Sequence, residues 1–195
     1  KGMRIVANEN DLPEAISAAQ REAKNAFDDE RVFLERYIPK SRHIEVQILG
    51  DSHGNLLHLG ERECSIQRRH QKIIEEAPSS AISEEQRELI TDAALRIGES
   101  LDYQSAGTVE FLLDDETGDF FFLEVNTRLQ VEHPVTEAIT GIDLVREQLK
   151  ISSGDAISFT QDNLISKGHA VEARLYAEDP SEEFLPSTEK ILAFY

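Results

Sequence analysis

The chain has 195 residues, of which 39% are hydrophobic, so it is long enough to bury the core of one domain or a little more. Its formal net charge of −18 disfavours general binding to nucleic acid or to an anionic membrane. It has no long apolar stretch and no signal peptide, and its single cysteine, Cys64, excludes an internal disulfide framework and fits a reducing compartment. Because the chain begins at Lys1 rather than at a methionine, we expect it to be a piece of a longer protein.

The N-terminal part of the chain predicts one helix followed by strands. From residue 11 to 27, apolar residues recur at steps of three and four, which is the spacing of one helix face. Residues 31–38 predict a strand. Residues 43–49 alternate between apolar and polar side chains, a glycine-containing turn follows, and residues 56–60 return, which predicts a hairpin.

The middle of the chain predicts a second helix and a second pair of strands. Residues 61–76 are rich in charge and show no clean period. Residues 83–101 predict a helix that opens with a capping box of the pattern Ser-x-x-Gln. Strands are predicted at 106–113 and 119–125, joined by a polar turn.

The last third of the chain predicts short elements. Residues 126–135 predict a loop, 143–151 a short helix, 155–168 a polar connector and 171–176 a strand. Strands follow strands directly along the chain, so the predicted class is α+β, with a mixed, largely antiparallel sheet and flanking helices.

Acidic side chains on two neighbouring predicted strands indicate a metal site. Glu110 is a lone carboxylate among apolar residues. The apolar run 120–123 predicts a buried strand, and four polar residues follow it at a spacing of two, which places them on one face: Glu124, Asn126, Arg128 and Gln130. Two carboxylates on adjacent strands suit Mg²⁺, which prefers oxygen ligands, and an arginine beside them suits a small anion. The alternative is that Glu110 faces outward from a half-exposed strand.

A basic run within this acidic chain is a second candidate site. Residues 61–72 concentrate arginine, histidine and lysine, a composition suited to a polyphosphate, although a solvated basic patch is the alternative. Cys64 has no evident base partner, so we expect a structural thiol. Near the C-terminus, Arg174 and Glu172 share one face of the last predicted strand, and from the residues alone we expect a surface ion pair there.

A set of sequence motifs is spread over the whole chain. They are Lys1-Gly-Met-Arg4, Arg42-His-Ile-Glu-Val-Gln47, Gly60-Glu-Arg-Glu-Cys-Ser-Ile-Gln-Arg-Arg-His-Gln-Lys72, Glu75-Glu-Ala-Pro78, Ala106-Gly-Thr-Val-Glu-Phe111, Glu124-Val-Asn-Thr-Arg-Leu-Gln-Val-Glu-His-Pro134 and Gly168-His-Ala-Val-Glu-Ala-Arg-Leu-Tyr-Ala-Glu-Asp-Pro180. This set resembles the biotin carboxylase component of biotin-dependent acyl-CoA carboxylases, which has the ATP-grasp fold. Carbamoyl-phosphate synthetases share that fold but lack this combination of motifs.

The resemblance implies an ATP-dependent reaction in two steps. Bicarbonate is phosphorylated to carboxyphosphate, and the CO₂ that this releases is transferred to N1 of biotin on a carrier protein. The implied cofactors are ATP, Mg²⁺ or Mn²⁺, and carrier-bound biotin. The implied partners are the carrier and a carboxyltransferase within a homodimer or larger complex, in the bacterial cytoplasm or the mitochondrial matrix, with neither nucleic acid nor membrane as a partner.

The resemblance also implies roles for individual residues. The adenine hinge is formed by Glu35, Arg36, Tyr37 and Ile38. Ribose and phosphate contacts are made by His43, Gln67 and His70. The metal ligands are Glu110, Glu124 and Asn126. Bicarbonate is held by Arg128, Gln130 and the backbone of Val131. The remaining catalytic groups are Lys72 near phosphate and bicarbonate, Glu132 as the base for bicarbonate, and Arg174 as the group that stabilises the biotin enolate.

The resemblance divides the chain into three parts. Residues 1–38 correspond to the C-terminal part of the lid subdomain, 39–168 to the central ATP-grasp domain and 169–195 to the start of the C-terminal subdomain. Most of the glycine-rich lid loop and the N-terminal domain fall outside this piece, so we expect it to be inactive alone. Position 36 is arginine where the family often has lysine, a change that spares a backbone contact but alters a side-chain contact.

Two other functions fit the same fold. One is a different ATP-grasp ligase, similar to carbamoyl-phosphate synthetase or to a urea-carboxylating enzyme. The other is a non-catalytic nucleotide-binding module, whose sign would be loss of the acidic and basic site residues; all of them are present. The sequence does not identify the acyl-CoA, because that specificity resides in a separate carboxyltransferase.

Overall fold

The computed structural model describes residues 2–187, and the chain divides into two units between Pro39 and Lys40. The first unit contains a short 3-10 turn, η1 (Glu9–Asp11), and helix α1 (Leu12–Phe27). A proline in its first turn is compatible with helix geometry, and the helix ends where Asp28 adopts a left-handed φ of 57°. The predicted helix at 11–27 is therefore confirmed.

The predicted strand at residues 31–38 is wrong. This segment has no helix or strand assignment, and no strand within the described residues pairs with it. Most of its apolar side chains are exposed within the described residues: Phe33 is 81% exposed and Leu34 69%, whereas Ile38 is buried. A run of β-favouring residues forms a strand only where a neighbour supplies backbone partners.

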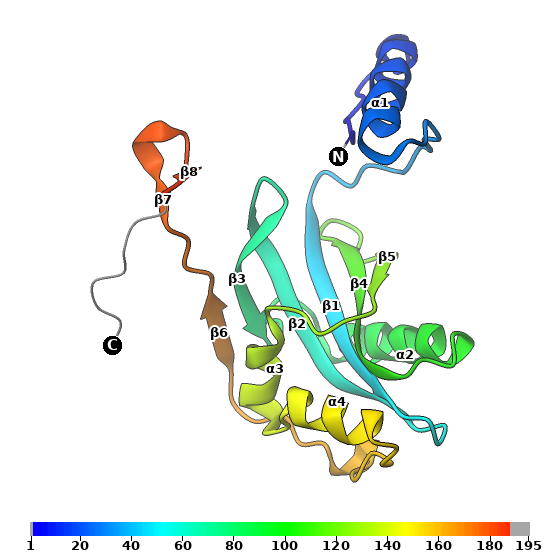
Figure 1. Ribbon diagram of the computed structural model, residues 1–195, viewed down its shortest axis with the longest axis vertical. Helices are drawn as coiled ribbons and strands as arrows, with labels where there is room; N and C mark the ends of the chain where they lie inside the picture. Colours follow the sequence, from blue (N-terminus) through cyan, green and yellow to red (C-terminus); the bar gives the residue numbers. More distant parts are fainter. Residues whose placement is uncertain (1, 188–195) are drawn as a thin grey trace. The chain divides into compact units, whose positions relative to one another are not determined.

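The second unit is built on a six-stranded sheet with the order β5-β4-β1-β2-β3-β6, and every neighbouring pair is antiparallel (Figure 1). The strands are β1 (Ser41–Gly50), β2 (Leu56–Arg68), β3 (Gln71–Ala77), β4 (Ser105–Asp114), β5 (Phe120–Asn126) and β6 (Ala170–Ala173). The predicted hairpin is confirmed as β1 and β2, and the second predicted pair as β4 and β5.

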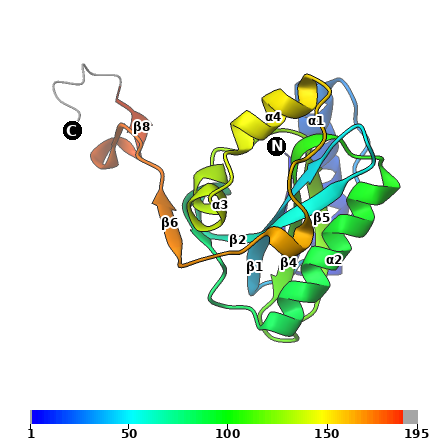
Figure 2. The ribbon, with the colours of Figure 1, turned by 90° about the horizontal axis from the view of Figure 1, so that it is seen from below.

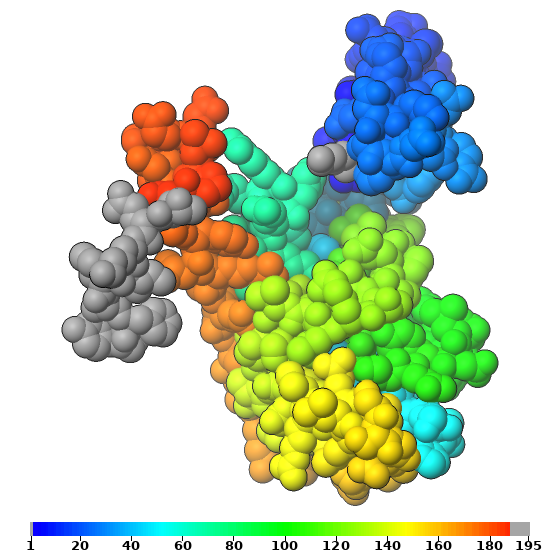
Figure 3. Space-filling view, viewed as in Figure 1, coloured from blue at the N-terminus to red at the C-terminus, as the bar shows by residue number. Residues whose placement is uncertain are grey.

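Helices cover both faces of this sheet. They are α2 (Glu84–Ser100), α3 (His133–Thr140) and α4 (Leu144–Ser152). Helix α2 packs on one face, and α3 and α4 pack on the other, as Figure 2 shows from below. Figure 3 shows α4, in yellow, at the surface of the viewed side. The predicted capping box is present, with Ser83 Oγ accepting from the N–H of Gln86 and the Gln86 side chain accepting from the N–H of Ser83.

Shorter elements complete the second unit. They are the 3-10 turns η2 (Gln161–Asn163) and η3 (Pro180–Glu182) and the two-stranded ribbon of β7 (Glu178–Asp179) and β8 (Leu185–Pro186). The strand predicted at 171–176 is shorter than expected and ends at Ala173. No helix in residues 2–187 is both long enough and apolar enough to span a bilayer.

The alternation of β1 divides the sheet into an apolar face and a polar face. Ile44, Val46 and Ile48 are fully buried against α2. The residues between them, Glu45 and Gln47, are also fully buried, although they point to the opposite face, where α3 and α4 lie. Buried polar groups need hydrogen-bond partners, so this second face must contain a connected polar network.

The charged segment 61–76, for which the sequence indicated no regular period, forms the rest of β2 and all of β3. A two-residue turn joins the strands, and both turn residues, Arg69 and His70, adopt left-handed φ values of 53° and 63°. These values belong to a type I′ hairpin turn, which usually contains Asn-Gly or Asp-Gly. The chain lacks that signal here, and the segment predicted as a loop at 126–135 similarly includes the first turn of α3.

Strand β5 is an edge strand rather than the buried strand predicted from the run 120–123. Phe122 is 56% exposed and Leu123 39%. Leu123 is also the extra residue of a β-bulge, because Glu110 pairs with Glu124 while the next residue, Phe111, pairs with Phe122. Because of this extra residue, Phe122 and Glu124 lie on opposite faces although they are two positions apart.

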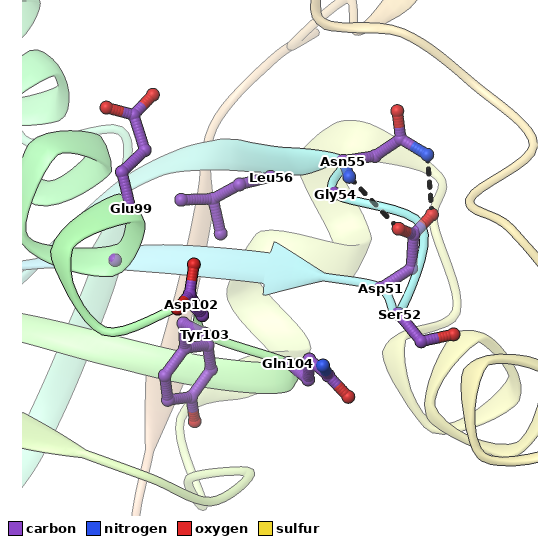
Figure 4. Close-up of a pocket in the computed structure, with 10 residues that line it drawn as sticks. Asp51, Ser52, Gly54, Asn55, Leu56, Glu99, Asp102, Tyr103 and Gln104 are labelled. Atoms are coloured by element: carbon purple, nitrogen blue, oxygen red, sulfur yellow. Dashed lines mark hydrogen bonds between the residues drawn. The ribbon is translucent and has the colours of Figure 1, made fainter.

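The β1–β2 turn is closed by a buried carboxylate. Asp51 is 3% exposed; its Oδ1 accepts from the backbone N–H groups of His53 and Asn55, and its Oδ2 accepts from the side chain of Asn55 and the N–H of Ile157. Figure 4 shows this turn beside a surface cavity that also involves Leu56 and the end of α2. The cavity shares no residue with the polar network of the opposite face.

Candidate active site

The antiparallel register brings four charged residues into one row across the sheet. Glu124 on β5 pairs with Glu110 on β4, Glu110 pairs with Glu45 on β1, and Glu45 pairs with Arg62 on β2. Directly paired residues point to the same face, so three carboxylates and one guanidinium lie side by side on the face of the sheet that carries α3. The cluster therefore arises from register alone.

Arg62 is the fully buried centre of this row. Its guanidinium donates to Glu45 Oε1 at 2.6 Å and to Gln47 Oε1 at 2.8 Å. It also donates to Thr136 on α3, to Thr108 on β4 and to Gln130. Burial alone would lower the pKa of Arg62, but the charge and hydrogen bond of Glu45 outweigh it and raise the pKa, so the guanidinium stays charged.

Lys72 connects three carboxylates. Its Nζ lies 2.8 Å from Glu110 Oε1 and 2.7 Å from Glu132 Oε1, and it also donates to Glu45. Burial would lower the pKa of the ammonium group, but Glu45 and the other carboxylates outweigh burial and raise it. Lys72 is therefore a fixed positive charge in a largely anionic pocket.

Glu110 is the most heavily contacted acid of the site. Its Oε1 accepts from Asn126 at 2.9 Å and from Gln130 at 2.8 Å, in addition to Lys72. Nε2 of His43 lies 2.7 Å from its Oε2. Burial would raise the pKa of Glu110, but His43 and then Lys72 outweigh it, so the pKa lies well below the ordinary value.

Glu132 joins Lys72 to Arg174. Its Oε1 accepts from Lys72, and its Oε2 accepts from Arg174 Nη2 at 2.8 Å. Burial would raise the pKa of Glu132, but Lys72 lowers it by more. Arg174 also binds Glu75 through Nε at 2.7 Å. The expected surface ion pair between Arg174 and Glu172 is thus wrong, because the arginine turns to β3 and to the residue that precedes α3.

The basic segment contributes neutral groups as well. The Gln67 amide nitrogen lies 3.1 Å from His43 Nδ1 and donates to the backbone carbonyl of Cys64 at 2.8 Å. Cys64 is fully buried, and burial, reinforced by Glu45, raises the pKa of its thiol. A thiol in this state is not a nucleophile, as expected from the sequence.

Several predicted site residues lie outside this network. Arg128 is exposed and donates to the carbonyl of Leu129 at 3.2 Å, and no carboxylate among the described residues accepts from it. Val131 is 58% exposed, and His70 is exposed at the β2–β3 turn. The predicted hinge residues Glu35, Arg36, Tyr37 and Ile38 belong to the first unit, residues 1–39.

The structure adds residues that sequence analysis missed. They are Glu45, Gln47, Arg62, Glu75, Thr108 and Thr136. A usable signal was present in β1, where the apolar residues at 44, 46 and 48 leave His43, Glu45 and Gln47 together on the other face. Glu75 and Thr136 carried no comparable signal, because their positions depend on how β3 and α3 pack.

The chain matches the family described as "Carbamoyl-phosphate synthase L chain, ATP binding domain" over residues 1–160, and it belongs to that family. It is 51% identical over 191 residues to the biotin carboxylase of Haemophilus influenzae, covering 98% of this chain and 42% of that protein. It is 52% identical over 186 residues to the mitochondrial methylcrotonoyl-CoA carboxylase subunit alpha of Rattus norvegicus, covering 95% of this chain and 26% of that protein.

A solved structure agrees with these sequence matches. The biotin carboxylase domain of the 2-oxoglutarate carboxylase of Hydrogenobacter thermophilus, in complex with MgADP, ADP and bicarbonate, superimposes with a TM-score of 0.90 at 46% identity, over 95% of this chain and 41% of that one. The ATP-grasp fold and the resemblance to biotin carboxylases are therefore confirmed. The chain spans about two fifths or less of the length of these relatives.

Proposed function

We propose that the longer protein containing this chain is an ATP-dependent ligase that carboxylates biotin on a carrier protein. The observation that carries this proposal is the chain of contacts from Lys72 through Glu132 to Arg174, beside the paired carboxylates Glu110 and Glu124. The similarity to biotin carboxylases over nearly the whole chain supports it. The relatives differ in the acid that their names specify, so the acyl acceptor, and with it the carboxyltransferase partner, is left open.

The donor set fits a divalent metal. Glu110 and Glu124 face one another, and Nδ2 of Asn126 donates to both at 2.9 and 3.0 Å. Oxygen ligands of this kind suit Mg²⁺ or Mn²⁺. To act as a third ligand, Asn126 would present its amide oxygen rather than its nitrogen to the ion. When bound, the ion would supply charge neutralisation for the phosphates of ATP.

We propose that Arg128 binds the anionic substrate. Its exposed guanidinium offers a planar pair of donors that matches a carboxylate-like anion, and no carboxylate must be displaced to use it. Gln130 is held by Arg62 and Glu110, so it is a rigid neighbour for the same anion. We assign bicarbonate to this position, with the Val131 backbone as a further contact.

We propose that Glu132 accepts the proton of bicarbonate. In the reaction that we propose, the terminal phosphoryl group of ATP passes to a bicarbonate oxygen, and the bicarbonate proton passes to Glu132 Oε1. A carboxylate paired with both Lys72 and Arg174 is a weak base, since the two cations stabilise its charged form. The role therefore requires Lys72 to exchange its contact with Glu132 for the anionic phosphate. Carboxyphosphate then breaks into CO₂ and phosphate, the phosphate takes the N1 proton of biotin, and the resulting biotin enolate, stabilised by Arg174, adds CO₂ at N1.

For the nucleotide we propose the contacts that the family resemblance implies, each residue taken by itself. His43, Gln67 and His70 lie on β1 and the β2–β3 hairpin, and the hinge residues 35–38 precede β1. We propose that the division of the chain into lid, central and C-terminal subdomains follows the ranges expected from the sequence, and that the whole protein acts in the bacterial cytoplasm or the mitochondrial matrix.

One experiment separates this function from its rivals. In the full-length protein, free biotin should increase bicarbonate-dependent ATP hydrolysis and yield carboxybiotin. A ligase similar to carbamoyl-phosphate synthetase would hydrolyse ATP without stimulation by biotin, and a urea-carboxylating enzyme would carboxylate added urea. A non-catalytic module would not hydrolyse ATP under either condition.

A further inference from the structure

Arg174 is held between two carboxylates that come from different elements. Its Nε donates to Oε1 of Glu75 on β3 at 2.7 Å, and its Nη2 donates to Oε2 of Glu132 at 2.8 Å. Its backbone N–H donates to the carbonyl of Ile73 at 2.9 Å, so the main chain is fixed as well. Since a guanidinium is planar and rigid, contacts at Nε and at Nη2 together define the plane in which it lies.

Burial of the Glu75 carboxylate is energetically unfavourable unless the carboxylate has a partner. The residue is fully buried, and no hydrogen bond within the described residues reaches its Oε2. No hydrogen bond in this part of the chain joins it to Glu110 or Glu124 either. A buried carboxylate is tolerated only when a partner offsets its desolvation, and the hydrogen-bonded partner here is Arg174.

The opposite strand offers a comparison at the same level of the sheet. Glu172 on β6 pairs directly with Glu75, and its Oε2 is likewise buried without a hydrogen-bond partner in residues 2–187. Glu172 makes no hydrogen bond to Arg174 among these residues, although it is only two positions away along the chain. The two glutamates therefore share sheet level and burial of Oε2, and they differ in whether they hold the arginine.

We propose that Glu75 is a positioning residue for the proposed carboxylation, which orients the guanidinium of Arg174 toward Glu132 and the incoming substrate. The inference rests on the proposed function, in which Arg174 acts on biotin. It adds that the orientation of Arg174 is set from β3, behind the site, by a residue that touches neither substrate. Misplacing a reacting group by about 1 Å can cost on the order of 10²-fold in rate.

The test uses the full-length protein with Glu75→Gln, which keeps the size of the side chain and one acceptor oxygen but removes the charge. Glu172→Gln is the matched control. Two rates are measured for each variant: bicarbonate-dependent ATP hydrolysis without biotin, and carboxylation of free biotin. We expect Glu75→Gln to lower biotin carboxylation about 10- to 100-fold, because a hydrogen bond between charged groups becomes a weaker bond to a neutral amide, while ATP hydrolysis without biotin is retained. Glu172→Gln should leave both rates close to those of the unmodified protein.

A double-variant cycle with Arg174→Ala distinguishes positioning from a general loss of stability. Once Arg174 is absent, Glu75→Gln should cause little further loss of biotin carboxylation, because the two residues act as one unit. Additive losses, or equal losses of both rates in Glu75→Gln alone, would overturn the positioning role.

An NMR measurement tests the positioning of Arg174 independently of the proposed function. The Nε–H proton of Arg174 should give a slowly exchanging NMR signal in the unmodified protein and in Glu172→Gln, and this protection should be lost in Glu75→Gln. If biotin fails to stimulate the unmodified protein, the proposed function is wrong, while this signal still tests the positioning of Arg174. An unchanged signal in a folded Glu75→Gln protein would contradict the positioning itself.

Discussion

Glu110 and Glu124 stand directly opposite one another on β4 and β5, and the one amide of Asn126 donates to both carboxylates. Like charges at directly paired positions destabilise an antiparallel sheet. Lys72 and His43 contact Glu110, and only the neutral amide of Asn126 bridges the two carboxylates, so a divalent cation between them would offset the remaining repulsion.

Replacing Glu124 by glutamine should therefore have opposite effects with and without metal. In the full-length protein treated with a chelator, Glu124→Gln should raise stability by about 0.5 kcal/mol, because it relieves the repulsion with Glu110. With Mg²⁺ and ATP, the same variant should weaken the dependence of turnover on Mg²⁺, because one anionic ligand has become neutral. Thermal unfolding and Mg²⁺ titration of ATP hydrolysis measure the two effects.

The exposed residue Glu88 on α2 provides the control for this prediction, since Glu88→Gln removes the same charge away from the site. A Glu124→Gln protein with unchanged turnover and an unchanged response to Mg²⁺ would show that the pair does not bind the metal.

Substitutions of Arg128 and of Glu132 should affect different steady-state kinetic constants of the full-length protein. Arg128→Ala should raise the KM for bicarbonate, since an exposed planar donor pair is lost. Glu132→Gln should lower kcat about 10²- to 10⁴-fold with less effect on that KM, because glutamine keeps the shape but cannot take a proton. An unchanged kcat and pH profile in Glu132→Gln would rule out the base role.

Arg62 should be essential for stability independently of any function. Arg62→Ala leaves the buried Glu45 with Lys72 as its remaining cationic partner and removes the donor of four further polar groups. Removing one partner of a buried ion pair costs about 3–5 kcal/mol. Urea unfolding of the purified chain measures this loss. The exposed Arg96→Ala on α2 should change stability by less than about 0.5 kcal/mol, and equal effects of the two variants would contradict the assigned network.

Asp51 should make folding sensitive to acid. Burial alone would raise its pKa, but hydrogen bonds from Asn55, Ile157 and His53 outweigh burial and lower it from 3.8 to about 2. A pKa that is lower in the folded state gives stability that is fully present above about pH 4 and is lost as the pH falls toward 2. Asp51→Asn should therefore cost about 1–3 kcal/mol at neutral pH, with the difference shrinking below pH 4.

Urea unfolding at a series of pH values from about 7 down to about 2 measures this difference. The control is Asp102→Asn, a substitution of an exposed residue that lines the same cavity. A stability difference between Asp51→Asn and the unmodified chain that stayed constant down to pH 2 would show that Asp51 does not titrate as described.

The isolated chain should bind MgATP weakly and should not turn over, since it spans about two fifths or less of its relatives. Calorimetric titration of the purified chain provides the measurement, with the full-length protein for comparison. A micromolar affinity would mean that residues 35–38, with His70 and Lys72, suffice for the nucleotide.

Sequence periodicity predicted the helices and strands that bury one face at a regular residue spacing. Helix α2 carries its own start signal in the capping box at Ser83, and β1 alternates cleanly. Strand β3 could not be found in this way, because its charged residues are buried by ion pairs with distant partners and its turn lacks glycine and asparagine. The segment 31–38 shows the converse, in which strand-forming residues meet no neighbouring strand.

The residues of the candidate site also divide into those that the sequence indicated and those that it did not. Glu110 and Glu124 were recognisable because a carboxylate within an apolar strand is unusual. Arg62 was not, since a basic residue in a charged run predicts solvent exposure until the pairing of β2 with β1 is known. Motif resemblance identified Arg174, whereas its contact with Glu75 depends on the pairing of β3 and β6.

The extra residue at Leu123 makes the position of the acidic pair depend on how β5 is paired as well as on its composition. If Leu123 entered the ladder opposite Glu110, the register beyond it would shift by one, and the side chains of Glu124 and Asn126 would turn away from Glu110, toward the layer beneath α2. Deleting Leu123 would instead remove the extra residue and leave Glu124 opposite Glu110. Comparisons of this segment between proteins should therefore treat a gap of one residue at this bulge as compatible with the acidic pair, and an altered pairing without a gap as equivalent to the loss of a ligand.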